Sequence, residues 1–429
     1  MKRWSLVERR RLRCRVIVRR SEPPYAGVVN TADHSASPVD ENPSWFDAAV
    51  LSHREAAWGA TMAGHRDGDA PVPVVAAHQD SLAGVDLVQP LLREEREEML
   101  RLGLAKGATL AAGGGDRARD EAPDPVRTCF ERDRDRILHS SSFRRLAGKT
   151  QVFVFPGDHQ RTRLTHALEV AQVARSIAQA CRLNVAFAEA IALGHDCGHG
   201  PGGHASEEAL SPYVDGGYDH AVWGADVALA SLNLCAETLD GIRNHSWSRP
   251  APTTPEGEVV SWADRIAYVC HDVEDAAAAG VVSISDLPSI VRERCGTTRS
   301  DQLNAFIAAM VDATASTGRI AMTADTAEAL ASFRRWNYER IYLRPESRHQ
   351  AGQVVRLLRA LVDMYVARPD ALPQPFRVDA AGSAALTRSA VTYVSGMTDR
   401  FACIQALTHL AWDPARLPAG VDVLSLRST

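Results

Sequence analysis

One helical stripe constrains the fold more than any other feature of the sequence. The stretch from 165 to about 182 has the composition of a strong helix. Within it, Val170, Val173 and Ile177 recur every three or four residues, which places them on one buried face. His166 lies on the same stripe. Because a buried polar group needs a partner, this segment predicts both a packed helix and a site that satisfies its histidine.

From Thr128 onward the rest of the chain shows the same helical period, and one short helix is expected before it. Further helices are expected at about 90–100, 130–146, 185–193, 219–235, 238–245, 258–279, 286–295, 301–316, 323–342, 348–367, 383–394 and 398–411. A brief β-like run, Q-V-F-V-F at 151–155, is ended by a Pro-Gly pair and suggests a small hairpin element. There is no βαβ alternation and no internal repeat, so the pattern predicts an all-α fold with a few minor short strands.

Composition shifts along the chain predict the domain organisation. Residues 1–90 mix Pro, Gly, Asp, Ala and His with little periodicity, which predicts a disordered or weakly structured extension. The patterned region, residues 91–415, is expected to form the folded domain, and residues 416–429 a tail.

Overall composition narrows the function classes. The chain has 429 residues, 45% hydrophobic and 24% charged, as in ordinary soluble globular proteins. The formal net charge of −5 gives no reason to expect nucleic acid as the main partner, so nucleic acid is possible but not indicated. The eight cysteines include no C-x-x-C pair, which fits a reducing cytoplasm. No apolar run approaches the roughly 18 residues that a bilayer-spanning helix needs, so no membrane partner is expected.

A second polar cluster follows the helical stripe. His195 lies on the inner face of the next helix, four residues after Ile191, and Asp196 follows at the helix end. Asp264 lies on a later helix with apolar neighbours, in W-A-D-R-I-A-Y. A lone buried histidine is more often a core residue bonded to backbone. Two histidines and two aspartates together favour a divalent cation, and ligands without thiolate suit Mn, Fe, Co, Mg or Zn.

Six stretches identify the family that the chain resembles. They are F-E-R-D-R-D-R-I-L-H-S, F-R-R-L-A-G-K-T-Q-V-F, R-T-R-L-T-H-A-L-E-V, G-H-D-C-G-H, W-A-D-R-I-A-Y-V-C-H-D-V-E-D-A and Y-V-S-G-M-T-D-R-F-A. In order and spacing they resemble the deoxyguanosine triphosphate triphosphohydrolase-like proteins of the HD-domain superfamily. The resemblance implies a helical HD core at about 160–280, a helical C-terminal part at about 281–415 and a homo-oligomer. It also implies one metal ion, held by His166, His195, Asp196 and Asp264.

The reaction implied by the resemblance is hydrolysis of a deoxynucleoside triphosphate, either dGTP or several of them, to deoxynucleoside and intact triphosphate. Water attacks the α-phosphorus and the 5′-oxygen leaves, which requires a proton relay. His204 and Glu207 match the catalytic histidine and its partner. Their i, i+3 spacing lets them touch across one helical turn, where a carboxylate would orient the imidazole.

Other residues suit the triphosphate and the sugar. Arginines and lysines crowd between 144 and 163, and individually a solvated surface position is the commoner fate. Asp264, Tyr268 and Asp272 recur every four residues on one helix face, although Tyr268 also suits core packing. The candidate substrate contacts, several of them assigned by resemblance, are Arg144, Lys149, Gln151, Arg163, His199, His220, Tyr268 and Asp272.

The sequence departs from the family pattern beside the site. Gly200 and Gly202 replace a proline and a phenylalanine, which predicts a more flexible loop. Ala221 and Trp223 replace two amides. Two alternatives therefore stay open. One is another HD phosphohydrolase that acts on a nucleoside monophosphate or on a cyclic or guanosine polyphosphate. The other is a nucleotide-binding regulator with weakened turnover.

Overall fold

The fold was analysed in a computed structural model of the protein. The structure describes residues 54–55, 59, 64–67, 72–81, 84–85, 89–157, 159–378 and 383–418. Most of the predicted extension, residues 1–90, and the tail from 419 onward therefore lie outside the described residues. The chain divides into two compact units, residues 1–87 and 88–429.

The first unit contains a short antiparallel hairpin. Its strands are β1 (His65–Asp67) and β2 (Val74–Ala76), with His65 opposite Ala76. These are the strands that the structure describes, in agreement with the expectation of few and short ones.

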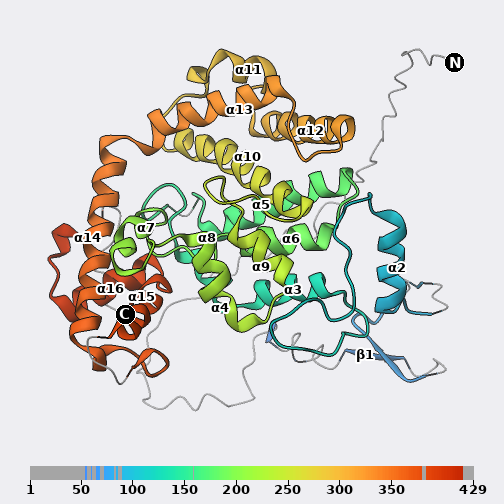
Figure 1. Ribbon diagram of the computed structural model, residues 1–429, viewed down its shortest axis with the longest axis horizontal. Coiled ribbons are helices and arrows are strands. Elements are labelled where there is room, and N and C mark those ends of the chain that lie inside the picture. Colours follow the sequence, from blue (N-terminus) through green and yellow to red (C-terminus); the bar gives the residue numbers. More distant parts are fainter. Residues whose placement is uncertain are drawn as a thin grey trace, which may run out of the picture. The chain divides into compact units, whose positions relative to one another are not determined.

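Helices make up the regular structure of the described part of the second unit apart from two isolated β-bridges, which confirms the all-α prediction (Figure 1). Its α-helices are α2 (Arg93–Gly103), α3 (Cys129–His139), α4 (Ser141–Arg145), α5 (Arg163–Ala180), α6 (Val185–Gly194), α7 (Ala205–Leu210), α8 (His220–Trp223), α9 (Ala236–Arg243), α10 (Pro255–Ala278), α11 (Ser289–Cys295), α12 (Arg299–Thr317), α13 (Ala324–Asn337), α14 (Pro345–Ala367), α15 (Ala384–Ser395) and α16 (Asp399–Leu410). A π-helical turn, Tyr338–Tyr342, follows α13.

Two local predictions were wrong. Residues 151–155 form bends rather than a strand, and the adjacent pairing is a single bridge between Thr150 and Thr162. The helix expected at 219–235 is broken into α8, a π-helical turn and a 3₁₀ turn, and it ends at Asn233 in a left-handed conformation. Apolar spacing alone did not reveal these interruptions, because the buried residues keep a helical period across them.

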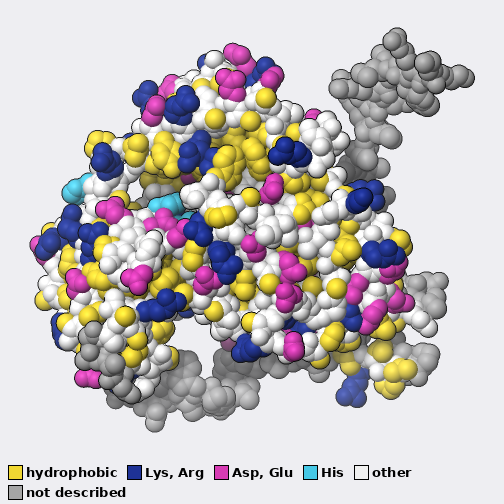
Figure 2. All heavy atoms as spheres, viewed as in Figure 1, with side chains coloured by type: hydrophobic (Ala, Val, Ile, Leu, Met, Phe, Trp, Pro, Cys, Tyr) yellow, Lys and Arg dark blue, Asp and Glu magenta, His cyan; other side chains and the backbone are white. Residues whose placement is uncertain are grey.

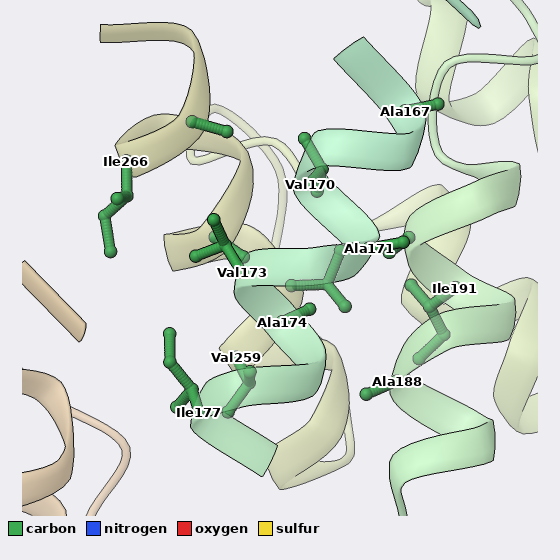
Figure 3. Packing of buried hydrophobic residues seen from close by; sticks show 14 of the residues in the cluster. Ala167, Val170, Ala171, Val173, Ala174, Ile177, Ala188, Ile191, Val259 and Ile266 are labelled. Atoms are coloured by element: carbon green, nitrogen blue, oxygen red, sulfur yellow. The ribbon is translucent and has the colours of Figure 1, made fainter. Parts of the chain in front are cut away.

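Two apolar cores fix the architecture of this unit. In the first, α5 packs against α6 and α10. In Figure 3, Val173 and Ile177 of the predicted stripe point to the side of α10, whereas Ala171 and Ala174 lie toward Ile191 and Ala188 of α6. In the second, α14 packs against α7, α15 and α16. Because α5, α6 and α10 pack on one another, the polar residues at their ends are held in fixed positions.

The loop between α6 and α7 is closely packed. Gly198 allows the close approach of α8, because a Cβ there would lie 2.0 Å from the His220 carbonyl oxygen. Gly202 has a φ of +72°, and its N–H donates to Asp399 Oδ1 at 2.8 Å. The Gly200 N–H donates to the Ser206 hydroxyl at 3.0 Å. The prediction of a looser loop therefore has no support in its contacts, since the glycines let the backbone approach its neighbours.

Candidate metal centre and substrate cavity

Four predicted ligands meet where three helices converge. His166 comes from the first turn of α5, His195 and Asp196 from the end of α6, and Asp264 from the middle of α10. His166 Nε2 lies 3.0 Å from Asp264 Oδ1, and His195 Nε2 lies 3.7 Å from the same oxygen. His195 Nε2 is 3.5 Å from Asp196 Oδ1. His166, His195 and Asp196 can each offer a ligand atom to one small space.

The state of His195 suits a metal ligand. Its Nδ1 lies 2.6 Å from the Ala192 carbonyl oxygen, which can only accept, so Nδ1 carries the proton. Its Nε2 is therefore a lone-pair donor, and this atom is buried without a hydrogen-bond partner among the described residues. A backbone contact that fixes the tautomer in this way is typical of metal-ligating histidines. The nitrogen and carboxylate donors fit a divalent cation without choosing among metals.

Arg163 supports the centre from the first turn of α5. It is 1% exposed, and its NH1 lies 2.6 Å from Asp196 Oδ2. Burial opposes ionisation of Asp196, but the positive charge of Arg163 holds the pKa of this carboxyl well below its usual range. Two other guanidinium nitrogens of Arg163, Nε and NH2, are buried without partners among the described residues. They remain able to donate to an anion in the adjacent cavity.

A row of histidines and one carboxylate extends from the centre. The His199 and His220 rings stack with centroids 3.7 Å apart. His220 Nδ1 lies 2.6 Å from Glu207 Oε1, and His220 Nε2 lies 3.3 Å from His245 Nε2. His204 lies at the start of α7, with its ring 5.0 Å from that of His199.

The charges along this row follow from its contacts. His245 Nδ1 faces the Ile242 carbonyl oxygen at 2.8 Å, so its Nε2 accepts and His220 Nε2 donates. Burial lowers the pKa of His245 to about 3. Burial opposes charge on His220 too, but the hydrogen bond to Glu207 outweighs it and raises the pKa of His220. His220 is therefore the cationic member of the row. His245 is neutral, and burial likewise lowers the pKa of His199 and that of His204, the latter to about 4.

The predicted His204–Glu207 contact is replaced by a different one. Within the part of the chain that the structure describes, Glu207 forms no hydrogen bond with His204. Its Oε1 instead accepts from both the backbone N–H and the ring of His220. Despite partial burial, the bond to His220 lowers the pKa of Glu207 to about 2. The reason is geometric, because the short helix α8 brings His220 over Glu207 while His204 faces the open side.

These groups open into a cavity of about 670 Å³, the size of a small-molecule site. Histidine side chains are visible in a hollow of the surface in Figure 2. The cavity is lined by most of the residues that the sequence predicted, namely Gln151, Arg163, His166, Asp196, His199, His204, Glu207, His220, Asp264, Tyr268 and Asp272.

Two predicted phosphate contacts lie elsewhere. Arg144 is exposed, and its NH1 donates to the His139 carbonyl oxygen at 2.6 Å. Lys149 is buried, and its Nζ donates to the carbonyl oxygens of His199 and Ser395. Burial lowers the pKa of Lys149 to about 7. Neither side chain lines the cavity. Basic residues that are close together in the sequence therefore point in different directions in the fold.

Tyr268 and Asp272 extend the site along α10. Asp272 is buried and accepts a hydrogen bond from the Tyr342 hydroxyl at 2.5 Å. Burial raises the pKa of Asp272 to about 7, although the Tyr342 bond opposes this shift. The Tyr268 hydroxyl accepts from Arg334 Nε at 2.6 Å. Gln151 lines the cavity beside them, and its side-chain oxygen has no hydrogen-bond partner among the described residues.

Sequence reasoning missed several residues of this cavity. His245 completes the histidine row but stands alone in G-I-R-N-H-S, so only its helix-end position could have drawn attention to it. Arg334 and Tyr342 come from α13 and the π-helical turn after it, far from every recognised stretch. Arg265 also lines the cavity. Its guanidinium carbon lies 3.4 Å from the Trp247 ring centroid.

Comparison with known proteins identifies the family. Residues 163–269 match the HD domain, and residues 320–406 match the phosphohydrolase-associated domain. A deoxyguanosinetriphosphate triphosphohydrolase-like protein from Caldanaerobacter subterraneus subsp. tengcongensis is 38% identical over 321 residues, which cover 73% of this chain and 94% of that protein. A protein of the same name from Clostridium perfringens is 38% identical over 72% of this chain and 95% of its own length. The chain belongs to this family of HD phosphohydrolases.

Membership fits the described architecture. The HD match begins at Arg163 and ends just after Tyr268, so it spans every predicted metal ligand. The phosphohydrolase-associated match covers all of α13 and α14, which supply further lining residues of the cavity. None of the helices that the structure describes combines the length and apolar composition needed to cross a membrane.

Proposed function

We propose that this protein hydrolyses deoxynucleoside triphosphates to a deoxynucleoside and intact triphosphate. One observation carries the proposal: a single cavity is lined by the histidine–aspartate centre, by uncommitted cationic groups and by a buried carboxylate suited to a sugar hydroxyl. A nucleoside triphosphate needs all three kinds of contact. The name shared by the relatives agrees with this substrate class.

His166, His195, Asp196 and Asp264 would hold one divalent metal ion. Such an ion, when bound, supplies a Lewis acid for a phosphate oxygen and lowers the pKa of bound water. The chain's own contribution is to hold the ligands ready. Arg163 keeps Asp196 ionised, and the Ala192 carbonyl keeps His195 in the ligating tautomer.

The triphosphate would lie against two groups of cations. Arg163 and the cationic His220 flank the centre on one side. Arg265 and Arg334 line the cavity on another side, and neither forms an ion pair with a carboxylate within the described residues. Preorganised donors of this kind stabilise charge that builds up on phosphate oxygens during displacement. His199 adds a further nitrogen beside Asp196, 3.2 Å from Oδ1.

Bond breaking needs a proton at the leaving oxygen. In the proposed reaction, the water oxygen forms a bond to the α-phosphorus, the bond from phosphorus to the 5′-oxygen breaks, and that oxygen takes a proton. The attacking water loses a proton in the same reaction. His204 faces the open cavity beside the histidine row, and burial lowers its pKa to about 4, so this neutral imidazole is our candidate to relay the proton from the water to the leaving oxygen. Glu207 has an indirect role, because its hydrogen bond keeps His220 in the cationic form that can donate.

The deoxyribose would lie along α10. Asp272 can accept from the 3′-hydroxyl, which is the single free hydroxyl of the deoxyribose, and the orphaned Gln151 oxygen is an alternative acceptor for the same proton. Tyr268, one helical turn before Asp272, would contact the sugar ring. Assembly as a homo-oligomer and a cytoplasmic location remain predictions.

The test is product analysis. The purified protein is supplied with Mn, Mg or Co and incubated with each of the four deoxynucleoside triphosphates. Chromatography should show a deoxynucleoside and intact triphosphate in equal amounts. Release of pyrophosphate or single phosphate would reject the proposed reaction. Turnover of only a nucleoside monophosphate, or of a cyclic or guanosine polyphosphate, would favour the other HD phosphohydrolases instead.

A further inference from the structure

The first two turns of α14 line the cavity with polar groups that have no assigned role. Glu346 and Gln350 both face the cavity, and their i, i+4 spacing makes them neighbours on the helix surface. Gln350 Oε1 is buried, and it has no hydrogen-bond partner among the described residues. Glu346 forms no ion pair or hydrogen bond within the same set. A buried acceptor without a partner is costly in free energy, so the Gln350 oxygen suits a ligand that brings a donor. The exposed Glu346 carboxylate beside it can accept a second hydrogen bond.

This wall begins beside Asp272 rather than at the metal ligands, because α14 starts just after the residue that bonds to Asp272. Asp264 belongs to the centre, and Asp272 is eight residues farther along α10, roughly 12 Å at 1.5 Å per residue. Tyr342 bonds to Asp272, and α14 begins three residues after Tyr342. A nucleotide with its α-phosphate at the centre and its sugar at Asp272 therefore extends its base toward α14.

Charge supports the same orientation. The Glu346 carboxylate would repel a triphosphate, whereas Arg265 and Arg334 on another wall would attract it. The neighbouring Arg344 is already engaged, since its Nε donates to the Ile341 carbonyl oxygen and its NH2 to the Ser347 hydroxyl. The phosphates and the base are thus directed to different walls.

The opposing surface suits a flat ring. Phe153 lines the cavity, with the Arg344 guanidinium carbon 5.8 Å from its ring centroid. Aromatic rings and guanidinium planes both offer faces on which bases stack. Two acceptors one turn apart, beside such a face, match a base that presents two adjacent N–H donors on one edge. Guanine does so through its N1–H and its 2-amino group, whereas thymine offers a single N–H between two carbonyl oxygens.

We propose that Gln350 and Glu346 are specificity-determining residues that accept hydrogen bonds from a guanine base. This inference rests on the proposed deoxynucleotide reaction for its orientation, and it adds the residues that select the base. Loss of a hydrogen bond at a site built for it leaves buried groups unpaired, which is why such sites discriminate strongly.

The test compares guanine with thymine in wild-type protein and in the variants Gln350→Met and Glu346→Gln. Steady-state kinetics give kcat/KM for dGTP and dTTP. Calorimetry gives Kd for deoxyguanosine and thymidine, which need no hydrolysis to bind. We expect wild type to prefer guanine, and each variant to lose on the order of tenfold of that preference. Gln353→Met is the matched control, because Gln353 lies on α14 but donates to the Leu417 carbonyl oxygen outside the cavity. Its guanine-to-thymine ratio should equal that of wild type.

The outcomes separate the two proposals. If wild type hydrolyses no deoxynucleoside triphosphate yet binds deoxyguanosine preferentially, and the variants lose that preference, the base subsite stands and the proposed reaction fails. If wild type shows no guanine preference, or both variants retain the wild-type ratio in kinetics and calorimetry, the base subsite is overturned whether or not the protein is active.

Discussion

The two ends of the cavity are built in opposite ways. At the metal centre the side chains contact one another: His166 touches Asp264, and Arg163 touches Asp196. At the α14 end the polar groups lining the cavity have few partners, as with the buried oxygen of Gln350. The first arrangement holds a fixed set of ligands before any substrate arrives. The second leaves its hydrogen-bonding capacity for the substrate, so we assign chemistry to one end and selection to the other.

The largest effect is expected at the metal centre. Asp196→Asn keeps the size of the side chain but removes the charge that Arg163 and the surrounding histidines are arranged to balance. Bound metal should be lost, and hydrolysis should fall by more than the roughly 100-fold that outer-shell substitutions cause. Metal analysis of the purified variant and initial rates measure both quantities.

The matched control for this variant is Asp226→Asn. Asp226 is an acidic residue outside the cavity, paired with Arg243. Its substitution should preserve both metal content and rate. If the Asp196 variant keeps its full metal content and full activity, the assignment of the metal centre is wrong. The contrast between the two ends of the cavity is then wrong as well.

A smaller effect is expected at the cation wall, which lies between the two ends. Arg334 lines the cavity, where it donates to the hydroxyls of Tyr268 and Tyr338. Arg334→Met should raise KM for the triphosphate by on the order of 10- to 100-fold, the usual cost of losing hydrogen bonds to a charged group. Arg335→Met is the control, because the exposed Arg335 is adjacent in sequence but does not line this cavity. Equal KM values in the two variants would place the triphosphate elsewhere.

The same contrast explains what could be predicted from the sequence. The centre was predictable because a histidine on an apolar stripe and an adjacent His-Asp pair are rare outside sites, and each lies in a short, recognisable stretch. His220 was predicted but its partner was not, since pairing with Glu207 depends on how the interrupted segment after Tyr218 turns back. Arg334, Tyr342 and Gln350 could not be found, because arginines, tyrosines and glutamines are ordinary on helices. Only the packing of α13 and α14 brings them to the cavity.

The smallest predicted effect tests the junction between the two ends. Tyr342→Phe removes the hydroxyl that donates to Asp272, and this bond opposes the burial that raises the pKa of Asp272 to about 7. Without the bond, the pKa of Asp272 should rise further, by roughly one unit for a hydrogen bond of about 1 kcal/mol. If ionised Asp272 accepts from the sugar hydroxyl, the acid limb of kcat/KM moves to higher pH by the same amount.

The pH dependence of thermal stability tests the contact between Tyr342 and Asp272 independently. A carboxyl whose pKa is raised by folding contributes stability below its unfolded pKa, near 3.8, and that contribution is lost as the pH rises through about 7. Tyr342→Phe worsens the ionised state, so its Tm deficit should be larger at pH 8 than at pH 5. Tyr213→Phe is the control, because Tyr213 donates to Asp363, an aspartate outside the cavity. If Tyr342→Phe leaves both the acid limb and the pH dependence of Tm at their wild-type values, Asp272 is not the titrating group, and the sugar must be held from another wall.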